Sequence, residues 1–178
     1  MPRILPAIAL MVGALLMGGC GSATAEGVLF PDALTAPVPD RPPVTIRLGG
    51  NEDVLVTSVR FEPRPDRTQA RNVFWCGVTV AEAGAAAQPI VTIGTGNTEA
   101  LSCDGMAEIG EVPGPKDGRA IGVVYRARSP NTEVLTAIIL VRRGADRTWV
   151  LDENLSERMV QRPGLLSLSG IRAALRPR

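Results

Sequence analysis

Short runs in which apolar and polar residues alternate, separated by turns rich in glycine and proline, fill most of the chain after residue 43. These runs cover residues 44–48, 54–62, 72–80, 90–93 and 119–128. Alternation with a period of two puts every second side chain on the same face of a β-strand, so each run predicts a strand. Turn or loop signals separate them at residues 49–51, 63–71, 94–97 and 111–118.

The clearest pattern is a group of three strands between residues 119 and 151. Residues 119–128 alternate, and residues 133–142 are apolar on both faces. A strand that is buried on both faces belongs in the middle of a sheet. A short connection at residues 129–132 and a turn at residues 144–146 then predict an antiparallel meander, which ends with a strand over residues 147–151.

Two short helices are predicted near the C-terminus. Residues 152–160 combine a good N-cap residue, Asp152, with apolar residues at helical spacing. Residues 163–176 are ambiguous, because their leucines alternate at first as in a strand but have helical spacing further on. We expect a helix over residues 169–175, while the choice between helix and strand stays open for the segment as a whole.

These elements predict a mainly β protein with one folded domain over residues 44–178. The expected fold is a single antiparallel β-sandwich or curved sheet, with one or two short helices near the C-terminus. The length of 178 residues suits one such domain preceded by a targeting segment. No internal repeat of fixed period is visible in the sequence, which argues against solenoid and propeller folds.

The first 19 residues have the three parts of a signal peptide. Arg3 and the terminal amine form a weakly positive start, residues 4–17 form an apolar run, and Gly18 and Gly19 supply small residues before a cleavage point. The apolar run is shorter than the roughly 20 residues that span a bilayer. The rival interpretations are an uncleaved N-terminal anchor and an ordinary signal peptide that is cleaved near residues 23–25.

The end of this segment, Leu16-Met17-Gly18-Gly19-Cys20, resembles the lipobox of bacterial lipoproteins. The resemblance implies that residues 1–19 are removed and that Cys20 becomes a lipidated N-terminus, with a diacylglycerol and usually an N-acyl chain such as palmitate. More than one buried acyl chain anchors a protein stably to a membrane. Gly21 is not the aspartate that marks inner-membrane retention in many Gram-negative lipoproteins. The resemblance therefore implies a cell-envelope location, on the periplasmic face of the outer membrane rather than on the inner membrane.

Residues 20–43 are expected to form the lipidated N-terminus and a proline-rich tether. The segment is rich in Gly, Ser, Ala and Pro and has no sustained periodicity. Closely spaced prolines favour extended polyproline conformations, so this segment would hold the domain away from the membrane.

The composition excludes several kinds of function. The chain has no histidine, which excludes Ser-His-Asp and Cys-His catalysis and every metal site that uses histidine. The formal charge of the whole chain is +1, and removal of residues 1–19 with Arg3 takes it to 0. A chain without net charge has no long-range field that favours nucleic acid, so no nucleic-acid partner is predicted. We also predict no cofactor and no bound metal.

Beyond Cys20, the chain has two cysteines, Cys76 and Cys103. An even remainder in an exported protein predicts one disulfide between them. The alternation over residues 72–80 places Cys76 toward a core, and residues 101–103 are expected to lie beside that strand. The alternative is two separately buried thiols.

Three patterns raise the question of a catalytic or binding site. The stretch Gly94-Thr95-Gly96-Asn97 looks like part of a phosphate loop, but it lacks the ending of a Walker motif, so a β-turn is favoured. The acid pairs Glu52-Asp53 and Asp152-Glu153 do not form catalytic dyads by themselves, because adjacent residues on a strand point to opposite faces. Two groups of arginines, in residues 60–71 and 126–143, are interspersed with acids, which predicts a salt-bridged surface rather than an anion-binding patch.

The leading functional hypothesis is a membrane-anchored envelope lipoprotein with a non-enzymatic binding or structural role. Its partners would be the membrane, through the lipid on Cys20, and an envelope protein or cell-wall component. One alternative is an envelope hydrolase that uses paired carboxylates, which predicts a concave pocket with two opposed carboxylates. Another is a proteinaceous inhibitor of a cell-wall enzyme. No residue is predicted to be catalytic, and a binding protein predicts instead an accessible patch, for example around Trp75.

Overall fold

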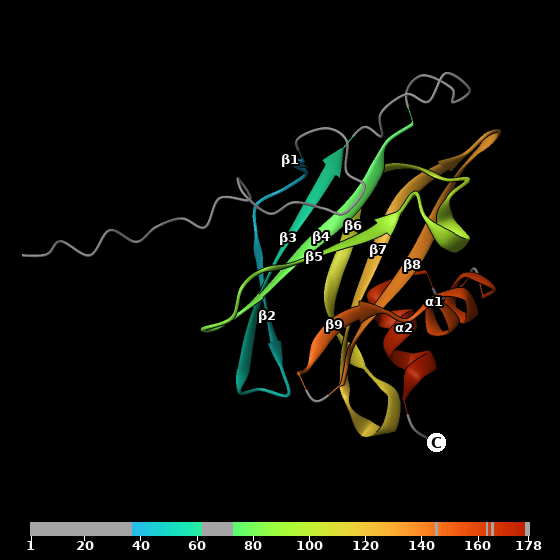
Figure 1. The fold of residues 1–178 in the computed structure, drawn as a ribbon. Coiled ribbons are helices and arrows are strands. Elements are labelled where there is room, and N and C mark those ends of the chain that lie inside the picture. The colour runs from blue at the N-terminus through green and yellow to red at the C-terminus, as the bar shows by residue number, and fades with distance from the viewer. Residues whose placement is uncertain (1–36, 62–72, 145, 163, 165, 177–178) are drawn as a thin grey trace, which may run out of the picture.

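The computed structural model describes residues 37–61, 73–144, 146–162, 164 and 166–176. Within these residues the chain forms two antiparallel sheets followed by two short helices (Figure 1). The first sheet contains β1 (Val38–Pro39), β2 (Val44–Leu48), β3 (Glu52–Phe61), β4 (Trp75–Glu82) and β5 (Gln88–Ile93). The second sheet contains β6 (Ser102–Pro113), β7 (Arg119–Ser129), β8 (Thr132–Arg143) and β9 (Thr148–Leu151). The helices are α1 (Glu153–Val160) and α2 (Leu168–Leu175).

The domain has three layers, which are the first sheet, the second sheet and the two helices (Figure 1). The facing sides of the sheets enclose the main core, to which the first sheet contributes Val56 and Val78 and the second contributes Val123. The helices α1 and α2 cover the other side of the second sheet, where a second apolar cluster forms around Ile139 and Ile171. The predicted mainly β sandwich with short C-terminal helices is confirmed.

The strand β8 lies inside the second sheet, whose strand order is β6-β7-β8-β9. Its side chains contribute to both apolar clusters, because Ile138 and Leu140 face the first sheet while Ile139 and Val141 face the helices. The ladder between β7 and β8 runs from the pair Ala120 and Val141 to the hairpin end without a register shift. The antiparallel meander and its doubly buried central strand are therefore confirmed.

The strand β6 is an element that the alternating pattern does not predict. Its register against β7 shifts between Cys103 and Gly105, and again between Met106 and Glu108. Each shift is a β-bulge, which inserts an extra residue and so interrupts the period of two. Gly105 has a φ of +130°, and a Cβ at this position would lie 2.9 Å from Oδ1 of Asp40. Glycine is required there because a side chain would collide with the neighbouring segment.

The folded domain begins earlier than the predicted boundary at residue 44, so the predicted tether is too long at its C-terminal end. The strand β1 pairs with the end of β3. Oδ2 of Asp40 accepts a hydrogen bond of 2.8 Å from the backbone N–H of Met106, and the guanidinium of Arg41 donates to the backbone C=O of the same residue. Such contacts between polar side chains and backbone leave no hydrophobic pattern in the sequence.

The ambiguous C-terminal segment is helical from Leu168 to Leu175. The helix α2 begins after Ser167, whose Oγ accepts a hydrogen bond of 3.1 Å from the N–H of Gly170. Its central residue, Ile171, is completely buried against the second sheet. Helical spacing is favoured because it turns the apolar residues of this segment onto the sheet, which confirms the expected helix.

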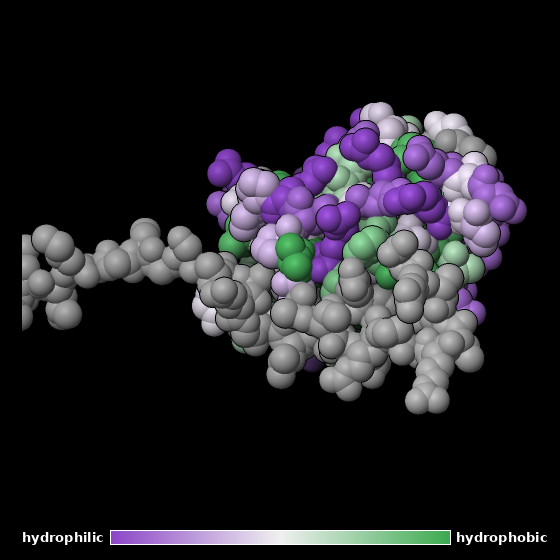
Figure 2. All heavy atoms as spheres, turned by 90° about the horizontal axis from the view of Figure 1, so that it is seen from above, coloured by the Kyte–Doolittle hydropathy of each residue, from purple (hydrophilic) through white to green (hydrophobic). Residues whose placement is uncertain are grey.

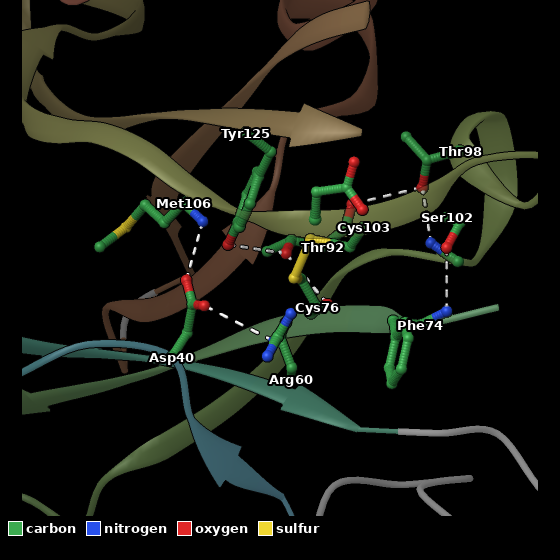
Figure 3. Close-up of a disulfide and its surroundings, with 12 residues drawn as sticks. Asp40, Arg60, Phe74, Cys76, Thr92, Thr98, Ser102, Cys103, Met106 and Tyr125 are labelled. Atoms are coloured by element: carbon green, nitrogen blue, oxygen red, sulfur yellow. Dashed lines mark hydrogen bonds and ion pairs between the residues drawn. A yellow bond between two sulfur atoms is a disulfide. The ribbon is translucent and has the colours of Figure 1, made fainter. Parts of the chain in front are cut away.

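A disulfide between Cys76 of β4 and Cys103 of β6 joins the two sheets (Figure 3). Both residues are completely buried, and the predicted pairing is confirmed. Beside the disulfide, Oη of Tyr125 and Oγ1 of Thr92 are hydrogen-bonded at 2.9 Å, and Oγ1 of Thr92 donates to the C=O of Cys76 at 3.1 Å. Burial raises the pKa of the Tyr125 phenol far above its ordinary value, and the charge of Asp40 raises it further.

Candidate functional site

A groove with a volume of about 330 Å³ lies between α1 and the segment that joins β5 to β6. Its floor contains residues 136–138 of β8, and its apolar lining consists of Leu101, Ala137, Ile138, Leu151 and Val160. Threonine and glutamate side chains line the walls. The volume is at the lower end of the range for ligand pockets, so the groove has room for a few side chains or a short stretch of backbone.

The wall formed by α1 is fixed to β8 through hydrogen bonds. Oδ1 of Asp152 accepts a hydrogen bond of 3.0 Å from the N–H of Leu155, which confirms the predicted N-cap. Oγ of Ser156 accepts from the N–H of Ile139 at 2.9 Å, and the N–H of Asp152 donates to the C=O of Ile139 at 2.8 Å. The first turn of α1 therefore satisfies both backbone groups of Ile139 and closes one end of the groove.

The opposite wall is the predicted turn after β5, which continues into a short 3₁₀ helix, η1 (Gly96–Thr98). Oγ1 of Thr98 accepts from the N–H of Gly94 at 3.2 Å and donates to the C=O of Thr95 at 2.8 Å. Gly94 has a φ of +110°, and a Cβ at this position would lie 2.3 Å from the ring of Trp75. The stretch is thus a tight turn packed against an indole ring, and its threonines line the groove.

Two carboxylates, Glu153 and Glu157, lie on the α1 wall. Residues four apart on a helix share one side, so both carboxylates belong to the same wall of the groove. Oε1 of Glu153 lies so close to Gly96 that a Cβ there would be 3.0 Å away, and Oε1 of Glu157 accepts a hydrogen bond of 3.2 Å from Gln161. Among the described residues, no Arg or Lys forms an ion pair with either carboxylate. The groove therefore carries uncompensated negative charge.

In the first acid pair, Glu52-Asp53, the carboxylate of Glu52 has a structural role. Arg142 of β8 donates two hydrogen bonds, of 2.7 and 2.8 Å, to the carboxylate of Glu52 and also contacts Glu82 at 2.7 Å. The guanidinium carbon of Arg142 lies 4.7 Å from the centroid of the Trp149 ring. The hydrogen bonds from Arg142 hold the pKa of Glu52 below its ordinary value. Glu52 therefore stays charged and ties the two sheets together, whereas a general acid needs a raised pKa.

Several of the other acids and arginines that the sequence singled out form ion pairs. These pairs are Arg47–Asp53 at 3.1 Å, Arg60–Asp40 at 3.6 Å, Arg128–Asp104 at 2.5 Å and Arg143–Asp152 at 3.1 Å. The salt-bridged interpretation is confirmed for these arginines. Arg126 is exposed and forms no ion pair among the described residues, so the interpretation does not hold for it. Arg64, Arg67 and Arg71 lie outside the described residues, so the prediction stays open for them.

A second, more polar hollow of about 560 Å³ lies where Asp40 and Arg41 meet β6 and the start of β8. Three of its five charged groups already have partners, because Asp40 and Arg41 bond the backbone of β6 and Asp104 pairs with Arg128. The other two, Arg126 and Glu133, form no ion pair among the described residues. This hollow is therefore a joint between the two sheets, and we regard the groove beside α1 as the better candidate site.

Trp75 is half-buried and does not form the exposed aromatic patch considered from the sequence. Its ring meets the ring of Phe61 edge to face, with centroids 6.1 Å apart, and covers Gly94. On the face shown in Figure 2, hydrophilic residues dominate the described surface and apolar residues are scattered between them. The described residues on this face form no broad apolar surface for a partner.

No protein-family model, no curated protein and no solved structure matches this chain. Within the described ranges, no three His, Cys, Asp or Glu side chains are grouped as the ligands of a metal ion would be. No helix that the structure describes is long and apolar enough to cross a membrane. Leu16 to Cys20 lie outside the described residues, so the lipidation of Cys20 stays a prediction.

Sequence reasoning did not single out Glu157 or the exposed side of β8. The sequence contains one signal for the second feature. The strand predicted over residues 133–142 is about twice as long as the strand predicted to follow it over residues 147–151. A long strand beside a short one leaves part of its edge without a partner, and the N-cap at Asp152 determines where the short strand ends.

Proposed function

We propose that this protein is a membrane-anchored lipoprotein of the bacterial cell envelope, with a non-enzymatic binding or structural role toward a protein or cell-wall partner. The observation that carries the anchor is the stretch Leu16-Met17-Gly18-Gly19-Cys20 with the apolar run before it. The buried disulfide supports an oxidising compartment, since such bonds persist mainly in exported proteins.

A binding role is supported by the groove beside α1. The groove combines an apolar floor with carboxylates that lack cationic partners among the described residues. A hydrolase that uses paired carboxylates needs them opposed across a cleft, whereas Glu153 and Glu157 lie on one wall. The hydrolase and enzyme-inhibitor hypotheses stay predictions, and the described contacts favour binding over catalysis.

The anchor is tested by the substitution Cys20→Ser. We expect the natural protein to enter the detergent phase on phase partitioning and to incorporate labelled palmitate. The C20S protein should lose the label and move to the aqueous phase, because a serine has no thiol to accept the lipid. A C20S protein that remains with the membrane would show that the uncleaved apolar segment is the anchor. The variant Ser22→Ala is the matched control, and it should behave as the natural protein does.

Two further measurements test the location and the binding role. If the outer membrane is the destination, Gly21→Asp should move the protein to the inner-membrane fraction of a density gradient. Affinity capture of the intact lipoprotein from solubilised envelopes should recover the same envelope partner in repeated experiments. Recovery of no specific partner would contradict the binding role without affecting the anchor.

A further inference from the structure

The strand β8 has a free edge over part of its length. β9 pairs only with residues 140–143 of β8, and no other described strand lies on that side. The N–H and C=O of Ile139 both point to this side, where they bond α1. Alternate residues of an antiparallel strand direct their backbone groups the same way, so Leu135 and Ala137 point theirs to this side too. Neither has a strand partner there among the described residues.

These two free positions differ in exposure. Leu135 is 42% exposed, whereas Ala137 is completely buried and belongs to the floor of the groove. Buried backbone N–H and C=O groups are nearly always hydrogen-bonded in proteins. The outward N–H and C=O of Ala137 have no partner among the described residues, and Ala137 lies at the floor of the groove. This indicates that a group from another molecule completes the hydrogen bonding of β8 at this position.

The walls of the groove define the chemistry of that incoming group. Leu135 and Val160 are two of the three large apolar side chains that remain exposed among the described residues. Val160 lines the groove from α1, whereas Leu135 lies next to it on β8, in the lining of the second hollow. An added strand would bury apolar side chains against them. Glu153 and Glu157 would attract a cationic side chain, since charge complementarity selects the partner and orients it.

We propose that β8 accepts an extended segment of a partner protein, which adds as a strand along Leu135 and Ala137 and places a Lys or Arg side chain against Glu153 and Glu157. The inference rests on the proposed binding role and specifies its site and the chemistry of the partner. In this mode of recognition, backbone hydrogen bonds supply affinity and side-chain contacts supply specificity. The bonds between α1 and Ile139 close the groove, so the added strand ends there.

A second copy of this chain is a poorer occupant than a basic segment. In a two-fold contact each copy presents the same surface to the other. Glu153 and Glu157 would then face an equally acidic groove, with no described Arg or Lys in its lining. Arg126 lies opposite Leu135 on β7 but outside the lining of the groove. A basic residue of a different chain therefore meets the charge of Glu153 and Glu157 more directly than a second copy does.

The test uses the full-length protein in detergent and a phage-displayed library of random peptides. We expect the selected peptides to alternate apolar and polar residues and to contain Lys or Arg. A saturating peptide should slow hydrogen exchange at the amides of Leu135 and Ala137 at least tenfold, because both gain an acceptor, and should leave the amides of β4 unchanged. N-methylation along the bonding edge of the peptide should weaken binding more than tenfold, and N-methylation along its other edge is the matched control.

Variants test the edge and the charge separately. Leu135→Pro removes an N–H that points away from β7, so it spares the ladder, and proline is tolerated at such edge positions. It should weaken peptide binding more than tenfold, whereas Leu135→Ser, which keeps the N–H, should weaken it less. Glu153→Gln combined with Glu157→Gln should weaken binding of the lysine peptide about tenfold and should not affect the same peptide with norleucine in place of lysine.

Several results would overturn the inference. These are a library that yields no enriched peptide, equal binding to L135P, unchanged exchange at Leu135 and Ala137, and protection of these amides by self-association alone. A protein that still captures its envelope partner but fails these tests would keep the proposed binding role and lose only the site on β8. The capture experiment, and not the peptide experiments, therefore distinguishes failure of the binding role from failure of the site on β8 alone.

Discussion

Ionisation of the single tyrosine should destabilise this protein at alkaline pH. Tyr125 is completely buried between the sheets, and its hydroxyl is hydrogen-bonded to Thr92. Burial raises the pKa of the phenol in the folded protein, since the phenolate would lie in an apolar core. In the unfolded chain the phenol titrates near its ordinary pKa of about 10. Above that pH the folded state holds a proton that the unfolded state has released.

The sign and the size of the effect follow from proton linkage. The folded-state pKa lies above the unfolded-state pKa, so the stabilisation is complete below pH ~10 and is lost as the pH rises. One proton of difference lowers the free energy of unfolding by about 1.4 kcal/mol per pH unit. Relative to pH 8, the expected loss is therefore about 1.4 kcal/mol at pH 11 and approaches about 2.7 kcal/mol at pH 12.

The assay is urea unfolding followed by circular dichroism between pH 8 and pH 11.5, with Tyr125→Phe as the matched control. The control should be about 1 kcal/mol less stable at pH 8, because it loses one buried hydrogen bond. Its free energy of unfolding should lack the alkaline slope that the phenol causes, because phenylalanine does not titrate. Lys116 and every other titratable group are the same in both proteins, so they do not contribute to the difference between the two pH profiles. Parallel pH profiles for the two proteins would refute the reasoning, because they would show that the phenol ionises in the folded state as readily as in the unfolded chain.

Three substitutions probe the other joints of the fold, each measured as a change in the free energy of unfolding in urea. Replacing Cys76 and Cys103 together by alanine should cost about 3–4 kcal/mol, since the bond closes a loop with a sequence separation of 27 residues; an unchanged stability would mean that the unfolded chain gains nothing from losing the bond. Arg142→Met should cost about 2 kcal/mol by leaving two half-buried carboxylates without their cation, and added salt should not reproduce this loss. Gly94→Ala should cost about 2–3 kcal/mol because of its positive φ and the adjacent indole ring, whereas the control Gly84→Ala, which has a positive φ but no neighbour within 4 Å, should cost less.

The alternation of apolar and polar residues predicted the parts of the fold in which the strands pair without bulges. The meander of β7, β8 and β9 follows from the regular period over residues 119–151, and the ladder between β7 and β8 has no register shift. The strand β6 was not predicted, because its two bulges interrupt that period. The strand β1 and the attachment of Asp40 were not predicted either, since they depend on hydrogen bonds to distant backbone groups.

The candidate site was harder to predict because it depends on several elements at once. The N-cap at Asp152 was clear from the sequence and determines where β9 ends. The sequence does not show that α1 then turns back along β8, or that the turn after β5 forms the opposite wall. The carboxylates of Glu153 and Glu157 become a feature of a groove only in the folded domain. Their lack of cationic partners within the described part of the chain is likewise a property of three-dimensional packing.

Two other sheet edges of the domain, those of β6 and β5, support the idea that the free part of β8 has a purpose. An exposed strand edge is a hazard, because it pairs with any extended chain, and proteins usually protect such edges. The edge of β6 is distorted by its bulges and bonded by Asp40 and Arg41, and β5 carries a proline, Pro89, on the far edge of the first sheet. The free part of β8 has neither device. At Ala137 it borders instead a groove whose α1 wall carries Glu153 and Glu157. These carboxylates would admit a matching basic strand and disfavour others, and this selective access is what a binding site needs.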